Sequence, residues 1–227
     1  MWRDAALVAG KDLRIEMRSR VVLHQVLPFA ALVLFLFAFA LGPDHHSLVV
    51  AAAGLFWVAV LFVTVLAVQR SAALESGAGA RDTLRLSGLD PGGIFLGKTV
   101  AVVLQLVVLE VLLGIGVVLL YGARVHSYPM LIGTAIAGTA GLAAAGTLYG
   151  SLTAGLRVRE TLLPFLLLPV AAPVLLAGTR LWQLSFATST NGADVTSSGP
   201  WLTLLLVFAV VYLALGVVVF GPLQEAS

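Results

Sequence analysis

The sequence contains no cysteine, and charged residues make up only 11% of its 227 positions. Without a thiol, the chain can form no disulfide, hold no metal through thiolate ligands and attach no heme through a thioether, and thiol catalysis is excluded. The four histidines are scattered, and no serine–histidine–aspartate set or workable pair of carboxylates accompanies them. These absences predict a chain that is not an enzyme by itself and that binds no metal, cofactor or nucleic acid.

Long apolar runs are what the sequence has in abundance: 60% of its residues are hydrophobic, and its mean hydropathy is +1.05. A helix needs about 20 apolar residues to cross a bilayer. We therefore expect residues 1–227 to form one all-α integral membrane domain with six transmembrane helices. The expected spans are residues 21–41, 48–68, 99–121, 130–152, 162–178 and 201–220. The fifth span is the shortest, and its three prolines predict either a kink or a connection to a partly inserted segment.

Lysine and arginine are concentrated in alternate connections between these spans. Eleven of the thirteen lie before the first span, between the second and third, or between the fourth and fifth, whereas only Arg124 and Arg180 lie in the other connections. Because cytoplasmic loops are rich in basic residues, both termini are expected in the cytoplasm. Three acidic residues in the first twenty argue against a cleaved signal peptide.

Residues 1–20 have the pattern of an amphipathic helix. Trp2, Leu13 and Met17 recur at helical spacing, and basic residues share another face. We expect an interfacial helix on the inner membrane surface, acting either as an anchor or as an elbow that moves with a cytosolic partner. The polar residues assigned to this helix are Lys11, Arg14, Glu16 and Arg18.

Residues 69–98 form the only polar connection large enough to contact a soluble partner. Within it, residues 92–99 match the P-loop pattern G-x-x-x-x-G-K-[ST]. A phosphate-binding loop needs a strand before it and an α/β domain around it, but here a transmembrane run follows directly. We expect the start of a helix instead, with Asp90 as N-cap and Pro91 in the first turn.

Glu110 lies in the middle of the third span, where an ionised carboxylate facing lipid costs about 2.5–3.5 kcal/mol on insertion scales. It is therefore expected to face protein, water or a proton. Two accounts are open: a hydrogen bond between helices, and a role in a transport path or in coupling.

The fourth span is rich in small residues, which allow close helix packing. They are Gly133, Ala137, Gly141 and Ala145 on one stripe, and Gly146 and Gly150 as a GxxxG pair. The packing could be internal, or it could serve pairing with a second membrane subunit.

Four stretches of the chain resemble those of a known family. They are residues 11–18 (KDLRIEMR), 54–59 (GLFWVA), 86–98 and 162–175. Together and in this order they resemble the heme exporter protein B (CcmB) family of cytochrome c maturation, within the ABC-2-type permeases. The likeness extends from about residue 5 to residue 221.

This resemblance implies a non-catalytic permease subunit of a bacterial inner membrane, driven by a separate cytoplasmic ATPase (CcmA-like) that binds the ATP. It also implies a heme-handling membrane protein (CcmC-like), a heme chaperone (CcmE-like) and a second permease copy or other membrane subunit as partners. Residues 69–98 are expected to hold the segment that docks on the ATPase. The residues assigned to this coupling are Glu75, Arg81, Thr83, Leu84, Arg85, Leu86, Gly97 and Lys98.

Heme is the substrate that the resemblance implies. No residue decides whether heme crosses the bilayer or ATP releases the loaded chaperone, although the lack of an obvious intramembrane ligand favours release. His45, His46 and His126 are candidate heme contacts on the outer side. A generic ABC-2-type exporter of a drug or lipid, and a scaffold that transports nothing, are the alternatives.

Overall fold

The computed structural model describes residues 1–19, 24, 27–40, 45–76, 88–153, 158–186 and 193–226. Within these ranges the chain is helical and contains no β-strand, as expected for an all-α fold. The helices are α1 (Trp2–Ser19), α2 (Leu27–Ala40), α3 (His45–Ser76), α5 (Pro91–Tyr121), α6 (Tyr128–Thr153), α7 (Arg159–Phe186) and α8 (Ala193–Ala226).

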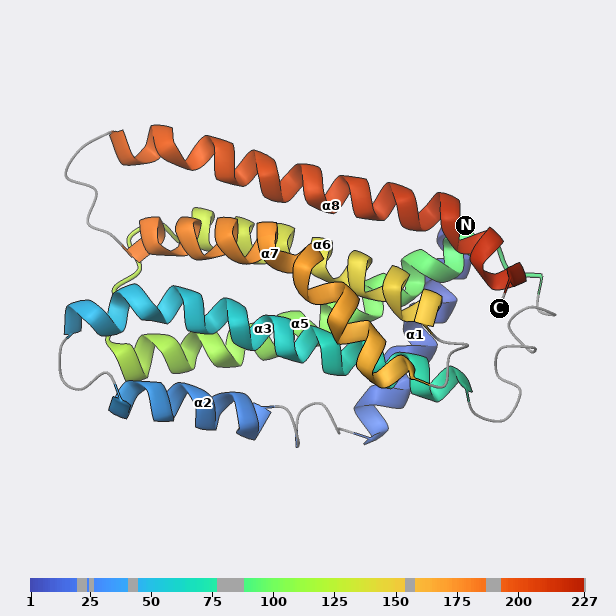
Figure 1. The fold of residues 1–227 in the computed structure, drawn as a ribbon, viewed down its shortest axis with the longest axis horizontal. Helices are drawn as coiled ribbons and strands as arrows, with labels where there is room; N and C mark the ends of the chain where they lie inside the picture. The colour runs from blue at the N-terminus through green and yellow to red at the C-terminus, as the bar shows by residue number, and fades with distance from the viewer. Residues whose placement is uncertain are drawn as a thin grey trace.

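Five helices, α3, α5, α6, α7 and α8, are long and apolar enough to cross a membrane. They run along the long axis of the molecule, with α8 at one edge and α2 at the other (Figure 1). Helix α2 has 14 described residues, which span about 21 Å at 1.5 Å per residue, less than the hydrocarbon core of about 30 Å. Both chain termini lie beside α1, at what we call the α1 end of the bundle (Figure 1).

Helix α7 extends beyond the fifth expected span, residues 162–178, at both ends. Helix α7 has 28 residues and contains Pro164, Pro169 and Pro173 within it. A proline removes one backbone donor and bends a helix, but packing against neighbouring helices allows the helix to continue. The ribbon of α7 accordingly changes direction along its length (Figure 1).

Two connections between the expected spans, the one before α8 and the one between α3 and α5, are also more helical than expected. Helix α7 ends at Phe186, and α8 begins at Ala193 and includes Pro200, so most of the connection between the fifth and sixth expected spans, residues 179–200, is helical. Helix α3 extends to Ser76, and α5 begins at Pro91. The polar connection 69–98 therefore consists of two helix ends on either side of residues 77–87, which lie outside the described residues.

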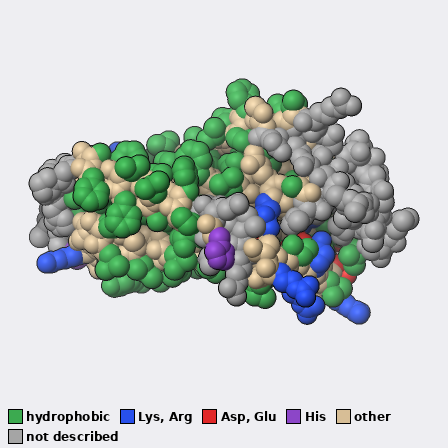
Figure 2. Space-filling view, turned by 90° about the horizontal axis from the view of Figure 1, so that it is seen from below, with side chains coloured by type: hydrophobic (Ala, Val, Ile, Leu, Met, Phe, Trp, Pro, Cys, Tyr) green, Lys and Arg blue, Asp and Glu red, His purple; other side chains and the backbone are tan. Residues whose placement is uncertain are grey.

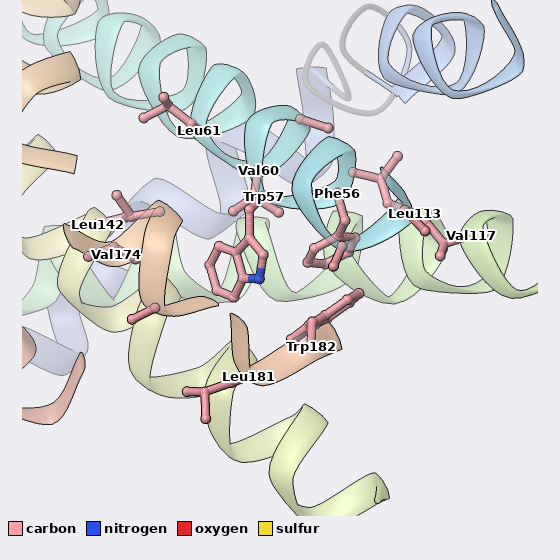
Figure 3. Packing of buried hydrophobic residues seen from close by; sticks show 14 of the residues in the cluster. Phe56, Trp57, Val60, Leu61, Leu113, Val117, Leu142, Val174, Leu181 and Trp182 are labelled. Atoms are coloured by element: carbon pink, nitrogen blue, oxygen red, sulfur yellow. The ribbon is translucent and has the colours of Figure 1, made fainter. Parts of the chain in front are cut away.

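The centre of the bundle is filled by aromatic side chains from α3 and α7. Phe56 stacks on Trp182 with ring centroids 3.7 Å apart, and Trp57 meets both rings edge-on (Figure 3). Trp57 is fully buried, and α6 and α7 can approach its ring closely because each has a glycine there. A methyl group on Gly138 of α6 or Gly178 of α7 would lie 2.4 Å from the indole ring.

Three glycines of α6 serve packing within the chain, whereas Gly133 has open space beside it. A methyl group on Gly141 would lie 2.7 Å from Phe208 of α8, and methyl groups on Gly146 and Gly150 would lie 2.8 Å and 2.6 Å from Val68 of α3. The GxxxG pair therefore brings α6 against α3. Of the two accounts of these residues, the structure shows internal packing.

Candidate functional site

Helix α1 packs across the start of α5 at the α1 end of the bundle (Figure 1). Two glycines of α5 make the contact close. A methyl group on Gly97 would lie 2.6 Å from the carbonyl oxygen of Ala5, and one on Gly93 would lie 2.8 Å from that of Met1. Ala5 and Val8 are buried in this contact. We call the contact of α1 with Gly93 and Gly97 the α1 seat.

The first turn of α5 has the expected cap. Asp90 accepts a hydrogen bond through Oδ2 from the Gly93 amide at 2.7 Å, and Pro91 opens the helix. The Asp90 amide in turn donates to Oδ2 of Asp4 at 3.3 Å. This bond, together with the amino terminus nearby, lowers the pKa of the Asp4 carboxyl. Residues 92–99 belong to this helix, so the P-loop-like sequence is not a phosphate-binding loop.

The charges of α1 are segregated between two faces. Glu16 accepts a hydrogen bond from Nε of Arg70 at 3.0 Å, which joins α1 to α3. Asp12 is partly buried and pairs with Lys11 at 3.0 Å. The exposed basic residues are Arg3, Lys11, Arg14 and Arg18. On one face of the molecule, Lys and Arg gather toward one end, and hydrophobic side chains cover the other half (Figure 2).

The apolar residues of α1 divide in the same way. Trp2 and Met17, which define the predicted apolar face, are 80% and 69% exposed. Ala5, Val8 and Ala9 are buried against the bundle. The helix therefore has one face for α5 and a second, unpacked face that combines apolar and basic side chains. Its position on a membrane surface stays a prediction.

Two of the residues assigned to coupling, Gly97 and Lys98, are buried in α5. Lys98 is only 5% exposed and lines a small cavity of about 30 Å³ with Val68, Thr147 and Phe220. Neither residue presents a surface to a docked protein in this conformation. Any part that Gly97 plays in coupling would act through the packing of α1 on α5.

The other residues assigned to coupling lie outside what the structure describes. They are Arg81, Thr83, Leu84, Arg85 and Leu86. Glu75 lies in the last turn of α3, but its side chain is not among those described. The helices on both sides of this segment nevertheless contact α1. Arg70 of α3 donates a hydrogen bond to Glu16, and the amide of Asp90, at the start of α5, donates one to Asp4.

Glu110 is buried between α5 and α6, and it accepts a hydrogen bond from the hydroxyl of Thr139. The predicted hydrogen bond between helices is therefore present. Glu110 also lines an apolar groove of about 430 Å³ between the two helices. A role in transport or coupling stays a prediction, because the hydrogen bond neither requires nor excludes it.

His45, His46 and His126 lie toward the end of the bundle opposite α1 (Figure 1). His126 follows α5, and its backbone amide donates to the carbonyl oxygen of Ser185 at 2.8 Å. Its Nδ1 lies 3.1 Å from two backbone carbonyl oxygens, which only accept, so Nδ1 carries the proton and Nε2 keeps its lone pair in the neutral ring. His45 and His46 begin α3. Among the described residues, no three His, Asp or Glu side chains form a metal-binding group.

The sequence reasoning missed the α1 seat. A signal for it was present, because Ala5 and Ala9 on α1 and Gly93 and Gly97 on α5 each form a small-xxx-small pair. Such pairs let two helix backbones approach closely. The pair on α5 was instead considered as part of a P-loop pattern and of the coupling segment.

Known proteins match this sequence over nearly the whole chain. Heme exporter protein B of Pseudomonas aeruginosa is 29% identical over 204 residues, 90% of each chain. That of Haemophilus influenzae is 32% identical over 195 residues, covering 86% of this chain and 88% of the relative. That of Paracoccus denitrificans is 29% identical over 177 residues, covering 75% and 78%. Residues 4–222 match the model of the CcmB protein family, and the chain therefore belongs to this family.

Proposed function

We propose that the chain is the membrane-spanning permease subunit of an ABC-type complex that delivers heme for the maturation of c-type cytochromes. The family match over residues 4–222 carries this proposal. Heme is proposed as the substrate because the relatives are named heme exporter protein B. The match favours heme over the drug or lipid substrate of a generic ABC-2-type exporter.

In the proposed arrangement, six helices span a bacterial inner membrane, and both termini lie in the cytoplasm. Five long apolar helices and the bias of basic residues toward alternate connections support it. The first expected span, residues 21–41, contains α2 and is the sixth helix of this arrangement. Helix α1 lies on the inner membrane surface, with Arg14 and Arg18 near lipid headgroups and Trp2 and Met17 in the boundary layer.

The native protein offers a direct test of this topology because it has no cysteine. Single substitutions Ser87→Cys and Ser127→Cys place one thiol in each of two connections. A membrane-impermeant maleimide should label Ser127→Cys in intact spheroplasts and Ser87→Cys only after the membrane is permeabilised. Labelling of Ser87→Cys from outside would contradict the arrangement.

Coupling is proposed to run from a separate ATPase through residues 69–98 to the bundle. The α1 seat supports a rigid connection, because α1 contacts α5 through Gly93 and Gly97 and contacts α3 through Glu16 and Arg70. A push on the segment between α3 and α5 would then move both helices and α1 together. ATP binds to the partner in this scheme and not to this chain.

The ATPase partner is tested by purifying the chain with it and measuring hydrolysis. Leu84→Ala and Arg85→Ala should reduce coupled ATP hydrolysis or release the ATPase. Arg180→Ala is the matched control, because it removes a charge near the C-terminal end of α7, far from this segment in the sequence. It should change neither coupled hydrolysis nor binding of the ATPase. A scaffold predicts wild-type hydrolysis for all three variants, and that result would remove the coupling role.

The heme-handling membrane protein, the heme chaperone and a second permease copy are the further partners proposed. His126 has the geometry of an imidazole that can offer Nε2 to iron, because backbone carbonyls hold its Nδ1–H. His45 and His46 are weaker candidates, since adjacent side chains diverge. A His126→Gln variant that keeps wild-type cytochrome c yield would exclude a necessary heme contact there.

Glu110 is proposed to act within the membrane. Glu110→Gln keeps the size of the side chain and should leave folding intact while it lowers cytochrome c yield. Thr139→Val is the matched control, because it removes the hydrogen bond of Glu110 and keeps the carboxyl group. Wild-type yield with Glu110→Gln would reduce Glu110 to a packing residue.

A further inference from the structure

The groove beside Glu110 is a fixed feature of the fold. It runs between α5 and α6, and Phe56 of α3 and Trp182 of α7 are among the residues that line it. Near one end of the groove, the Glu110–Thr139 hydrogen bond joins its two walls. Near the other end, the link between α5 and α6 is held to α7 by the bond from His126 to Ser185. The walls are therefore held together at both ends and separated between them.

Small residues leave the space between the walls open. Gly114 of α5 and Ala135 of α6 both line the groove, and a methyl group on Gly114 would meet no atom within 4 Å. At Gly138, three residues beyond Ala135, the space is instead occupied by Trp57, whose ring would lie 2.4 Å from a methyl group added to the glycine. No neighbouring helix packs against Gly114, so the space beside it is available to a ligand.

The lining of the groove is suited to hydrocarbon. Among the described residues that line it, Glu110 is the only Asp, Glu, Lys, Arg or His side chain. An amphiphile with carboxylate groups, such as a porphyrin, would find no cationic side chain in the groove and one acidic group of its own kind. Buried charges need a partner, so this lining disfavours such a ligand. An uncharged chain meets no such cost.

The groove is also open to the surroundings of the bundle. Residues of its lining remain well exposed on both helices, with Leu119 at 77% and Ile132 at 52%. Its volume of about 430 Å³ is nearly three times that of an engineered apolar cavity of about 150 Å³, which stays dry and binds benzene. In a bilayer, the apolar groups that reach such an opening are lipid tails.

We propose that the groove between α5 and α6 is a binding site for one acyl chain of a membrane phospholipid. The proposal rests on the membrane placement proposed above, but not on heme transport. The chain enters from the side, past Leu119 and Ile132, and lies against Gly114 and Ala135. Heme does not use this groove. The lipid tail also keeps water away from the buried hydrogen bond of Glu110.

The test is lipid retention by the full-length protein, purified from membranes and gently delipidated before native mass spectrometry. Wild type should keep a tightly bound phospholipid. Gly114→Leu fills the groove and should lose it, while Gly133→Leu, at a site on α6 that is equally open but outside the groove, should keep it. Ala135→Leu fills the groove from the other wall and replaces Gly114→Leu if that variant does not fold. Equal retention in wild type and both groove-filling variants would overturn the proposal.

Two further measurements separate the possible occupants. Glu110→Gln should retain the lipid, because an acyl chain requires no charge, and its loss would point to a ligand that binds the carboxylate. Titration with heme, followed by absorbance, should respond equally in wild type and Gly114→Leu. Heme binding that Gly114→Leu abolishes would assign the groove to heme and refute the lipid site. Neither measurement involves the ATPase, so the lipid site can fail while the transport role stands.

Discussion

The substitution Gly97→Ala tests the α1 seat most directly. It adds one methyl group to α5, 2.6 Å from the carbonyl oxygen of Ala5 and 2.7 Å from Cβ of Val8. Ordinary van der Waals contact begins at 3.4 Å, so α1 must move by about 0.8 Å at this point. The nearest atom belongs to the backbone and not to a flexible side chain. A change of rotamer therefore cannot relieve the contact.

The size of the effect on α1 docking follows from two free energies of similar size. Overpacking of a well-packed contact costs about 1–3 kcal/mol. Burial of the Val8 side chain, which is 3% exposed, contributes roughly 1.5–3 kcal/mol to docking of α1. Since the strain is comparable with the docking energy, the undocked population of α1 should rise about 5- to 150-fold. The same methyl group on Gly114, which has open space around it, should have no such effect.

The assay uses the absence of cysteine. Ala9→Cys places a thiol in the buried face of α1, where the residue is 7% exposed, and maleimide labelling in native membranes then reports undocking. The Gly97→Ala background should be labelled faster than the parent, and the Gly114→Ala background at the parental rate. Equal rates in all three backgrounds would show that α1 does not lie against Gly97 in the membrane, and the reasoning about a rigid connection would be refuted.

Three other outcomes are expected. Gly178→Ala introduces a contact of 2.4 Å with Trp57 and should destabilise the protein by about 1–3 kcal/mol, measured as a lower midpoint of thermal aggregation; an unchanged midpoint would contradict the core packing. Glu16→Gln and Arg70→Gln should show a coupling energy of about 0.2–1 kcal/mol in a double-mutant cycle on Ala9→Cys labelling, decreasing with salt; strictly additive effects would exclude the ion pair. Because its pKa is lowered, ionised Asp4 should stabilise docking above the usual carboxyl pKa of about 3.9, and this contribution should be lost as pH falls below it. Amide exchange of α1, corrected for intrinsic rates, should therefore rise at low pH in wild type but not in Asp4→Asn.

Much of the fold could be predicted from local patterns. The apolar runs predicted the helices, because each run is long enough to cross a bilayer by itself. The helix start at Asp90 was predictable because a cap depends on a few adjacent residues. The length of α7 was not, because whether a helix continues through Pro164, Pro169 and Pro173 depends on the helices packed around it.

The candidate site shows the same division. The hydrogen-bonding need of Glu110 could be predicted from its depth in a span, but its partner Thr139 could not, because it lies 29 residues away on another helix. The burial of Gly97 and Lys98 was likewise not predictable from their position at the end of the polar connection 69–98. Gly97 is covered by α1, which lies about 90 residues earlier in the chain, and Lys98 faces residues of α3, α6 and α8.

The sequence alone determined that this is a helical membrane protein, and that residues 69–98 form its long polar connection. Those properties depend on composition and on patterns within single segments. Only the tertiary structure decided that α1 closes over α5, that Gly138, Gly141, Gly146 and Gly150 of α6 serve packing within the chain, and that a groove remains open beside Glu110. These features arise from contacts between helices far apart in sequence, where the absence of a single methyl group decides whether two helices touch or leave a space.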